Sequence, residues 1–241
     1  MKLDLTLLFL DDSLLAINKP AGILAIPDRW DPDAPVARSI LEKEYGALFP
    51  VHRIDRDTTG VLVYARSRDA HRTLSLDFST RQVKKEYLAI VCGEPTQDSW
   101  DVNLPLRADG DRLHRTVIDK SKGKESFTHF EVVERYRGYA LVRALPETGR
   151  THQIRIHLAA SGLPILADPL YGDGKSLLLS QIKRRWKGDA FEEKPLISRT
   201  ALHALRVSFA HPVLKTPLVL EAPEPRDFRA ALSQMRKLLA R

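Results

Sequence analysis

Short apolar runs alternate with polar, turn-forming segments at the start of the chain. Runs of four to six mostly apolar residues favour strands at Leu5–Leu10, Leu14–Ile17 and Val61–Ala65. The polar residues 11–13 separate the first two runs and predict a turn between them. Pro20 and Gly22 then interrupt the pattern, so we expect a loop after the second strand. The opening of the chain therefore predicts a strand hairpin that leads into a loop.

Four further segments space their apolar residues three or four positions apart, as amphipathic helices do. They are Pro35–Gly46, Asp69–Thr80, Arg150–Ser161 and Arg226–Leu239. Within the second of them, Leu74 and Phe78 are four residues apart and share one predicted face. Glycines after the first and third segments are plausible stop signals.

The remaining apolar segments predict strands, and many of them follow one another directly, as hairpins do. They lie at Lys85–Val91, Leu113–Ile118, Ser126–Glu134, Tyr139–Leu145, Ala201–Phe209 and Leu214–Leu220. Because strands outnumber helices, we expect an α+β fold with a largely antiparallel, mixed sheet and flanking helices. We interpret residues 1–241 as a single domain, with residues 173–199 as a polar, basic insertion within it.

Composition narrows the class of protein. Of 241 residues, 43% are hydrophobic and 29% are charged, as in soluble globular proteins. There is no repeat, no apolar run of membrane-spanning length and no signal-peptide pattern, so we expect a cytoplasmic protein without a membrane partner. The single cysteine, Cys92, argues against an intramolecular disulfide framework and a cysteine-based zinc site. The net charge of +7 suggests an anionic partner such as nucleic acid, although a merely basic protein is the alternative.

One polar loop carries candidate catalytic chemistry. The segment His52–Gly60 contains two aspartates, two arginines, a histidine and two threonines, and it leads directly into an apolar strand. Asp55 lies between Arg53 and Arg56 in sequence, and a neighbouring cation keeps a carboxylate ionised. An ionised carboxylate can act as a nucleophile or as a general base. A solvated charged turn with internal salt bridges would have the same composition.

Two other segments could add to such a site. On the predicted helix that begins near Arg150, His152 and Arg155 share a face, which could present an arginine to a carboxylate and a histidine to a substrate. His152 and His157 are five residues apart and lie on different faces, so we expect no metal there. Tyr87 follows two lysines at the head of a strand. It could stack on a base or exchange a proton, or it could be a half-buried strand residue.

Together these segments resemble the RluA-type RNA pseudouridine synthase family, in the order of that family's motifs. The matching segments are Leu7–Gly22, His52–Asp55 with Thr59 and Gly60, Lys85–Tyr87, Gly149–His157, Pro164–Asp168 with Tyr171 and Gly172, and His203–Pro212. The resemblance covers nearly the whole chain. It is closest to the short, single-domain members that lack an S4-like domain. It implies the pseudouridine synthase fold with a central catalytic cleft.

The resemblance also implies roles for particular residues. Asp55 falls on the catalytic aspartate, Tyr87 on the active-site tyrosine, and Arg155 on the arginine that pairs with the catalytic carboxylate. Arg53 falls where the family has a residue that displaces the target nucleotide. The residues that we expect to contact RNA are His52, Arg53, Thr59, Arg150, His152 and Gln153, with Lys183, Arg184, Arg185 and Trp186 in the insertion.

The implied activity is isomerisation of specific uridines to pseudouridine in structured RNA, either tRNA, 23S ribosomal RNA or both, after the base is flipped out. We expect a monomer that needs neither cofactor nor metal. Asp55 could attack C1′, attack C6 or remove the 2′ proton, and the sequence leaves these routes open. Three alternatives remain: a non-catalytic RNA-binding or ribosome-assembly module, a metal-dependent phosphodiesterase that uses Asp55 and Asp57, and a base-excising glycosidase.

Overall fold

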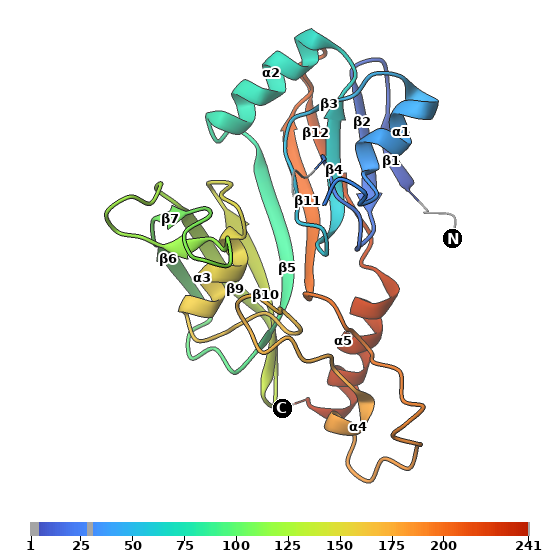
Figure 1. Cartoon of the computed structure of the whole chain (residues 1–241), viewed down its shortest axis with the longest axis vertical. Helices are drawn as coiled ribbons and strands as arrows, with labels where there is room; N and C mark the ends of the chain where they lie inside the picture. Colours follow the sequence, from blue (N-terminus) through green and yellow to red (C-terminus); the bar gives the residue numbers. More distant parts are fainter. Residues whose placement is uncertain (1–4, 28–30, 241) are drawn as a thin grey trace. The chain divides into compact units, whose positions relative to one another are not determined.

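The computed structural model describes residues 5–27 and 31–240, and these residues form two compact units (Figure 1). Unit 1 contains the described residues of Met1–Tyr87 and His203–Pro223, and unit 2 contains those of Leu88–Leu202 and Glu224–Arg241. Strands β5 and β11 each pass from one unit into the other along the chain. The expectation of one domain over the whole chain stays a prediction.

Unit 1 is built on a mixed, mostly antiparallel sheet with the strand order β1-β2-β4-β11. Strand β4 is antiparallel to β2 and parallel to β11, and the short strand β3 and strand β12 pair with β4 and β11. The strands are β1 (Thr6–Leu10), β2 (Leu14–Lys19), β3 (Phe49–Pro50), β4 (Thr59–Ala65), β11 (Leu202–Ala210) and β12 (Pro217–Glu221).

Both faces of the two central strands of unit 1 are buried, which explains why their sequences are continuously apolar. Successive side chains point to opposite faces of a strand. Leu14 and Val63 therefore pack in one cluster with Leu74 of helix α2 (Arg68–Ser79), and Phe78 packs against the same cluster. Residues of the other face pack in a second cluster with Leu41 of helix α1 (Ala37–Tyr45). The predicted pairing of Leu74 with Phe78 on one helix face is confirmed.

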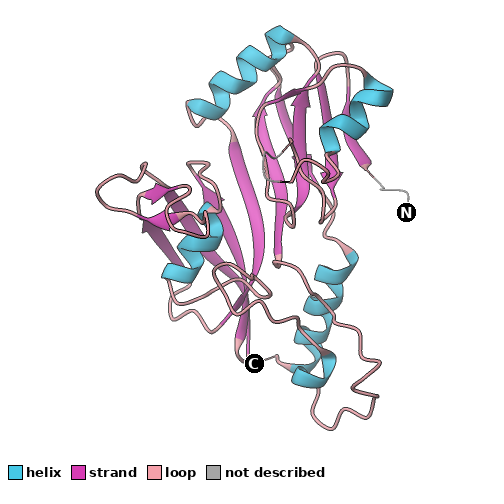
Figure 2. Cartoon of the chain, viewed as in Figure 1, coloured by secondary structure: helices cyan, strands magenta, loops and turns pink. Residues whose placement is uncertain are grey.

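Unit 2 contains an antiparallel arrangement in the order β10-β9-β6 and a separate two-stranded sheet of β7 and β8. Figure 2 distinguishes its strands from its helices. The elements are β6 (Ser99–Asn103), β7 (Leu106–Arg107), β8 (Val117–Ile118), β9 (Phe127–Tyr136), β10 (Tyr139–Pro146), α3 (Gln153–Ala160), α4 (Leu179–Ile182) and α5 (Arg226–Leu238), and β5 is Lys84–Cys92. The predicted α+β class with a mixed, mostly antiparallel sheet is confirmed.

Two predicted elements differ from the structure for local reasons. The strand predicted over Leu113–Ile118 is reduced to its last two residues, because Asp111 accepts hydrogen bonds from the backbone N–H groups of Leu113 and Arg115 and forms a turn. The helix predicted from Arg150 begins only at Gln153. The residue before it, His152, has left-handed backbone geometry (φ 55°), so the helix cannot extend further back.

The apolar pattern of the sequence did not predict two short elements. Strand β6 is mostly polar and exposed. It is held by antiparallel pairing with β9, and the ring of Trp100 stacks on Phe130 at a centroid distance of 5.2 Å. Helix α4 has only four residues and lies within the polar, basic insertion, for which no helix was predicted. Neither segment is long enough for its apolar residues to show the spacing of a helix or of a strand.

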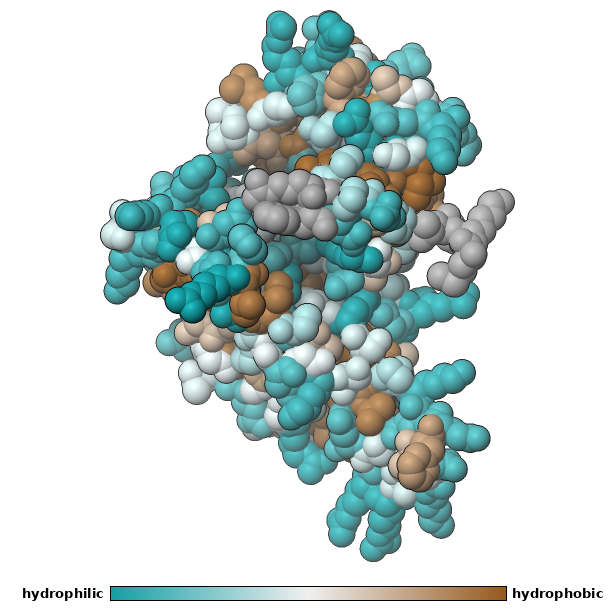
Figure 3. Space-filling model, viewed as in Figure 1, coloured by the Kyte–Doolittle hydropathy of each residue, from teal (hydrophilic) through white to brown (hydrophobic). Residues whose placement is uncertain are grey.

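The visible surface is largely hydrophilic, with scattered apolar side chains (Figure 3). In the part of the chain that the structure describes, no helix has the length and apolarity needed to cross a membrane.

Gly60, the second residue of β4, provides a test of the packing in unit 1. Its backbone has φ +114°, and a Cβ atom there would lie 2.1 Å from the Ala204 carbonyl oxygen. We expect Gly60→Ala to destabilise the protein by more than about 4 kcal/mol or to prevent folding, because two paired backbones would have to separate. Urea unfolding followed by circular dichroism measures the loss.

Gly46→Ala is the matched control. Gly46 also has a positive φ (+75°), but no heavy atom lies within 4 Å of its ideal Cβ position. Alanine there should destabilise the protein by only about 1–3 kcal/mol, the strain of a backbone conformation (φ 75°, ψ −163°) that residues other than glycine rarely adopt. If both variants lost the same free energy of unfolding, the close approach of Gly60 to Ala204 would not contribute to stability.

Candidate active site

A buried ammonium group joins two loops of unit 1. Strand β2 ends at Lys19, whose side chain is 0% exposed. Its Nζ donates hydrogen bonds of 2.9 Å to the backbone carbonyls of Pro20, Ile23 and Arg56. The first two carbonyls belong to the loop after β2 and the third to the loop 52–58. Because a buried charge must keep its hydrogen-bond partners, the two loops are held in one arrangement.

Arg56 adds a second connection between these loops. Its backbone carbonyl accepts a hydrogen bond from Gly22 N–H at 3.0 Å, and its Nε donates to Gly22 O at 3.2 Å. Its Nη1 forms an ion pair of 2.9 Å with Asp31. The Arg56 guanidinium therefore anchors the loop, and an effect of Arg53 or Arg56 on the charge of Asp55 stays a prediction.

Asp55 and Tyr87 are brought together in unit 1. Asp55 is half-buried in a turn that the hydrogen bond from Thr58 N–H to its carbonyl closes at 3.2 Å. Burial raises the pKa of the Tyr87 phenol, and the negative charge of Asp55 raises it further. Tyr87 is therefore protonated at neutral pH and can donate a hydrogen bond. Arg53, two residues before Asp55, is exposed.

Thr59 is held inside unit 1 by a histidine that the sequence analysis did not single out. The side chain of Thr59 is 3% exposed, and its Oγ1 lies 2.8 Å from His203 Nδ1. His203 Nε2 lies 3.1 Å from the carbonyl oxygen of Ala222 and donates to it, so Nδ1 accepts from the threonine hydroxyl. This chain of hydrogen bonds fixes the point at which the loop 52–58 enters β4.

His52 has a similar anchoring geometry at the other end of the loop. Its ring stacks on Phe78 at 4.9 Å, and its Nε2 accepts a hydrogen bond of 3.0 Å from Val63 N–H. Burial, with a smaller contribution from the positive charge of Lys85, lowers the pKa of His52 from 6.5 to about 3. The ring is therefore neutral at physiological pH. RNA contacts from His52 and Thr59 stay predictions.

Unit 2 presents a rigidly held arginine. Arg155 on α3 is 6% exposed, and its Nε and Nη2 donate to the two carboxylate oxygens of Asp168 at 2.7 and 2.8 Å. The guanidinium carbon also lies 5.3 Å from the centre of the Tyr171 ring. Burial alone would raise the pKa of Asp168, but the hydrogen bonds and charge of Arg155, with the backbone N–H groups of Leu170 and Tyr171, together lower it. The pair is therefore ionised.

His152 joins this cluster through Tyr171. Its Nδ1 lies 3.0 Å from the Tyr171 hydroxyl, which also accepts a hydrogen bond of 3.1 Å from Thr116 N–H. Asp168 and Tyr171 were part of a matching sequence segment, but no role was assigned to either. Their signal in sequence was weak because Asp168 lies thirteen residues from Arg155, outside any helical spacing.

Gln153 and Arg150 have different surroundings although they are close in sequence. Gln153 is buried, and its Oε1 accepts from the Thr148 hydroxyl at 2.8 Å and from Arg150 N–H at 2.9 Å. Its Nε2 donates to Phe127 O at 2.9 Å. Gln153 thus holds the turn before α3. The side chain of Arg150 is exposed at this turn, with a hydrogen bond from Nε to Glu125 O.

The insertion places its basic residues at the surface. Lys183, Arg184 and Arg185 are exposed, whereas Trp186 is half-buried. A Cβ atom at Gly188 would lie 2.3 Å from the Trp186 ring, so the indole packs directly on that glycine. One side of the ring is therefore covered by its own loop, and stacking of Trp186 on a base stays a prediction.

The structure thus groups the predicted site residues by unit. Arg53, Asp55 and Tyr87 belong to unit 1, and Arg155 belongs to unit 2 with His152. The predicted ion pair between Asp55 and Arg155 joins groups of different units and stays a prediction. Within the described ranges, no group of three or more His, Cys, Asp or Glu side chains is arranged to hold a metal ion.

Known proteins that resemble this chain share one activity. The sequence profile of a family described as RNA pseudouridylate synthase matches residues 13–160. A ribosomal large subunit pseudouridine synthase D of Xanthomonas campestris is 36% identical over 98% of this chain and 71% of its own length. A dual-specificity RNA pseudouridine synthase RluA of Pasteurella multocida is 36% identical over 88% of this chain and 90% of its own length.

Solved structures agree with the sequence comparisons. The human RNA pseudouridylate synthase domain containing 4 superimposes with a TM-score of 0.72 at 26% identity and covers 96% of this chain and 93% of its own. The human RNA pseudouridylate synthase domain containing 1 gives a TM-score of 0.69 at 25% identity, over 92% of this chain and 84% of its own. The expected pseudouridine synthase fold is therefore confirmed.

The anchoring role of His52 predicts a pH dependence of stability. Its folded pKa of about 3 lies below the ordinary value of 6.5, so its contribution to stability is complete above pH 6.5 and is lost as the pH falls toward 3. One such proton changes the free energy of unfolding by up to about 1.4 kcal/mol per pH unit in this window. Glutamine keeps a hydrogen-bond acceptor but does not titrate. We therefore expect His52→Gln to reduce the slope of the free energy of unfolding against pH by about that amount, as measured by urea unfolding at several pH values.

Above pH 7 the two proteins should differ in stability by a constant amount. If the free energy of unfolding changed equally with pH in the wild type and in His52→Gln between pH 6.5 and 4, the neutral state of this ring in the folded protein would be contradicted.

Proposed function

This chain belongs to the RNA pseudouridylate synthase family and is therefore an isomerase that acts on RNA, and we propose that Asp55 is its essential catalytic carboxylate. The match over residues 13–160 carries the proposal, because this range contains Asp55, Tyr87 and Arg155, the residues to which the resemblance of the sequence motifs assigns catalytic roles. The two anchored loops of unit 1 support it, since a catalytic carboxylate needs a fixed orientation.

The reaction conserves atoms and electrons. The bond between uracil N1 and ribose C1′ breaks, the base rotates, and a bond between C5 and C1′ forms. The C5 hydrogen leaves as a proton, and N1 gains a proton. No oxidant or reductant takes part, so we propose that the enzyme works without a cofactor or metal. An ionised Asp55 suits each open route: attack on C1′, attack on C6, or removal of the 2′ proton.

Tyr87 and Arg53 have complementary roles in this proposal. The protonated phenol of Tyr87, next to the charge of Asp55, donates a hydrogen bond or a proton during the rearrangement and stacks near the base. A uridine within a folded RNA must first leave its stack, at a cost of a few kcal/mol. The exposed guanidinium of Arg53 occupies the space that the flipped nucleotide vacates and so holds the open state.

Arg155 supplies positive charge of fixed direction. The two-point bond with Asp168 and the contact with the Tyr171 ring hold its planar guanidinium. We propose that this held guanidinium pairs with the Asp55 carboxylate, keeps it ionised and aims it at the ribose. Asp168 then acts as a positioning residue for Arg155.

We propose tRNA, large-subunit ribosomal RNA or both as the substrate. One similar protein is named for the large ribosomal subunit and another for dual specificity, so both RNAs must be tested. The net charge of +7 favours binding to either, because each contacted phosphate releases counterions. We further propose that the protein is a cytoplasmic monomer.

The central test is Asp55→Asn, which removes the charge but barely changes the shape of the side chain. We expect release of tritium from RNA labelled at uridine C5 to fall at least about 10⁴-fold, because an amide is neither a nucleophile nor a base of the strength of a carboxylate. RNA binding should remain within about threefold. The assay uses unmodified tRNA and ribosomal RNA in parallel with the wild-type protein.

Release that continues at the wild-type rate in Asp55→Asn would remove Asp55 from the chemistry. If the wild-type protein binds both RNAs but releases no tritium from either, the chain is a non-catalytic RNA-binding module. Arg68→Gln, a charge change on the exposed start of α2, is the control for general electrostatic effects.

Asp168→Asn tests the positioning of Arg155. We expect the turnover number to fall by about 100-fold while KM changes little, because a small misplacement of a catalytic charge has an effect of this size. Asp173→Asn, in an exposed ion pair of 3.5 Å with Lys175, should leave turnover unchanged. Melting curves for both variants separate positioning from folding. An Asp168→Asn variant with a normal turnover number would show that Arg155 is held without this carboxylate.

A further inference from the structure

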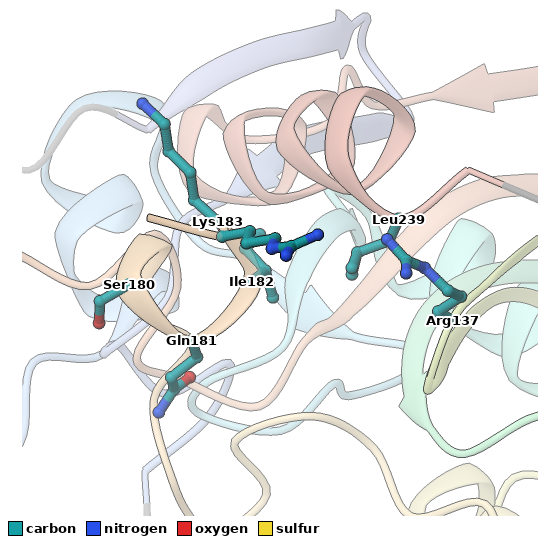
Figure 4. A pocket seen from close by; sticks show the side chains of 7 residues that line it. Arg137, Ser180, Gln181, Ile182, Lys183 and Leu239 are labelled. Atoms are coloured by element: carbon teal, nitrogen blue, oxygen red, sulfur yellow. The ribbon is translucent and has the colours of Figure 1, made fainter. Parts of the chain in front are cut away.

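A basic hollow of about 370 Å³ lies on unit 2, beside helix α4 (Figure 4). Its cationic lining consists of Arg137 from the turn between β9 and β10, with Lys183 and Arg184 from the end of α4. Ile182 and Leu239 form its apolar part. Figure 4 shows Arg137 next to Leu239, and Lys183 extending from the α4 side. Residues far apart in the sequence thus form one concave site.

The electrostatic field in this hollow is positive. Three side chains bring a charge of +3, and its lining contains no carboxylate. In the part of the chain that the structure describes, neither Lys183 nor Arg184 forms an ion pair, and both are exposed. The end of α5 contributes about half a negative charge at most, because exposed carbonyls at a helix C-terminus have that effective charge. The cations therefore dominate.

Arg137 is already oriented before any ligand binds. Its Nη2 donates to the Leu238 carbonyl at 2.9 Å, and its backbone N–H donates to the Leu239 carbonyl at 3.1 Å. These bonds satisfy the carbonyls at the end of α5 and fix the guanidinium beside the hollow. A fixed guanidinium loses less conformational entropy on binding an anion than a mobile side chain does.

The mixed lining indicates the chemical class of the ligand. Ile182 and Leu239 are 9% and 8% exposed, so they offer a small apolar surface. Guanidinium groups bind the paired oxygens of a phosphate, and an apolar wall suits the carbons of a ribose. A ribose phosphate backbone has both features, whereas a small inorganic anion has only the first.

We propose that this hollow binds a phosphodiester of the RNA substrate and adds affinity without taking part in the isomerisation. The inference rests on the proposed function, since it concerns the same RNA. Arg185 and Lys187 follow Arg184 in the sequence and are exposed as well, so the basic surface can continue along the backbone to neighbouring phosphates.

The test variant is Lys183→Gln/Arg184→Gln, which removes two exposed cations of the lining. Binding of fluorescein-labelled, unmodified tRNA and of a labelled 23S ribosomal RNA fragment is measured by anisotropy across a salt series. One lost phosphate contact should reduce the slope of log K against log salt by about 0.7–0.9, which corresponds to a five- to eightfold loss of affinity at 0.1 M salt. Arg137→Gln should have a similar effect.

Lys194→Gln/Arg229→Gln is the matched control, because it removes two exposed cations of unit 2 that do not line the hollow. Its slope should stay within about 0.3 of the wild-type slope. The rate of tritium release by the control variant should equal that of the wild type on both RNAs. An equal slope change in test and control variants, or no change in the test variant on either RNA, would overturn the inference.

Inorganic phosphate is the probe that distinguishes an RNA phosphodiester from a free anion in this hollow. Phosphate at constant ionic strength could raise the melting temperature of the wild type but not that of the test variant. If the slopes of log K for RNA binding against log salt are then equal in the two proteins, the hollow binds free phosphate and the inference is wrong. Binding is measured without turnover, so it tests the hollow even if the wild type releases no tritium. Tritium release by Asp55→Asn tests only the proposed function. The slope of log K against log salt tests only the hollow, so the two proposals can fail separately.

Discussion

The buried ammonium group of Lys19 is the constraint on which the arrangement of the loop 52–58 depends. A fully buried cation needs a carboxylate partner or several hydrogen-bond acceptors, and three backbone carbonyls from two loops accept hydrogen bonds from Lys19. Either loop can move only if the charge loses a partner, which costs about 1.5–3 kcal/mol for a charged hydrogen bond. The close approach of Gly60 to Ala204 and the bond between Thr59 and His203 fix the next residues. Asp55 therefore lies in a loop that is held on both sides.

Each compact unit holds one part of the proposed site in a defined electrostatic environment. In unit 1 the charge of Asp55 and burial keep Tyr87 protonated, so a carboxylate and a hydrogen-bond donor are close to each other. In unit 2 the Asp168 carboxylate orients the buried guanidinium of Arg155 through two hydrogen bonds and balances its charge. Such a pair is not a strong source of stability, because desolvation offsets much of the attraction. Its value for the enzyme is the fixed direction of the guanidinium.

The residues that sequence reasoning assigned to RNA contact fall into two physical groups. Nε2 of His52, the hydroxyl of Thr59 and the amide of Gln153 form hydrogen bonds with other protein groups, and these residues hold the loops in place. Arg53 and Arg150, like the basic residues of the insertion, are exposed cations. Affinity for a phosphate backbone comes mainly from such cations, whereas a neutral buried group contributes by keeping them in position.

Apolar periodicity and turn residues report local backbone conformation, so the amino-acid sequence predicted the α+β class and most strands and helices. The proposed roles of Asp55, Tyr87 and Arg155 came instead from the resemblance of their segments to the motifs of a known family. The sequence did not determine which partner each polar group has. The bonds of Lys19 to the carbonyl of Arg56, of Thr59 to His203 and of Arg155 to Asp168 join positions 37, 144 and 13 residues apart. The basic hollow likewise needs Arg137 beside the end of α4. Such pairs are selected by the packing of the whole chain, which excludes water and forces each buried charge to find a partner, and no local pattern contains that information.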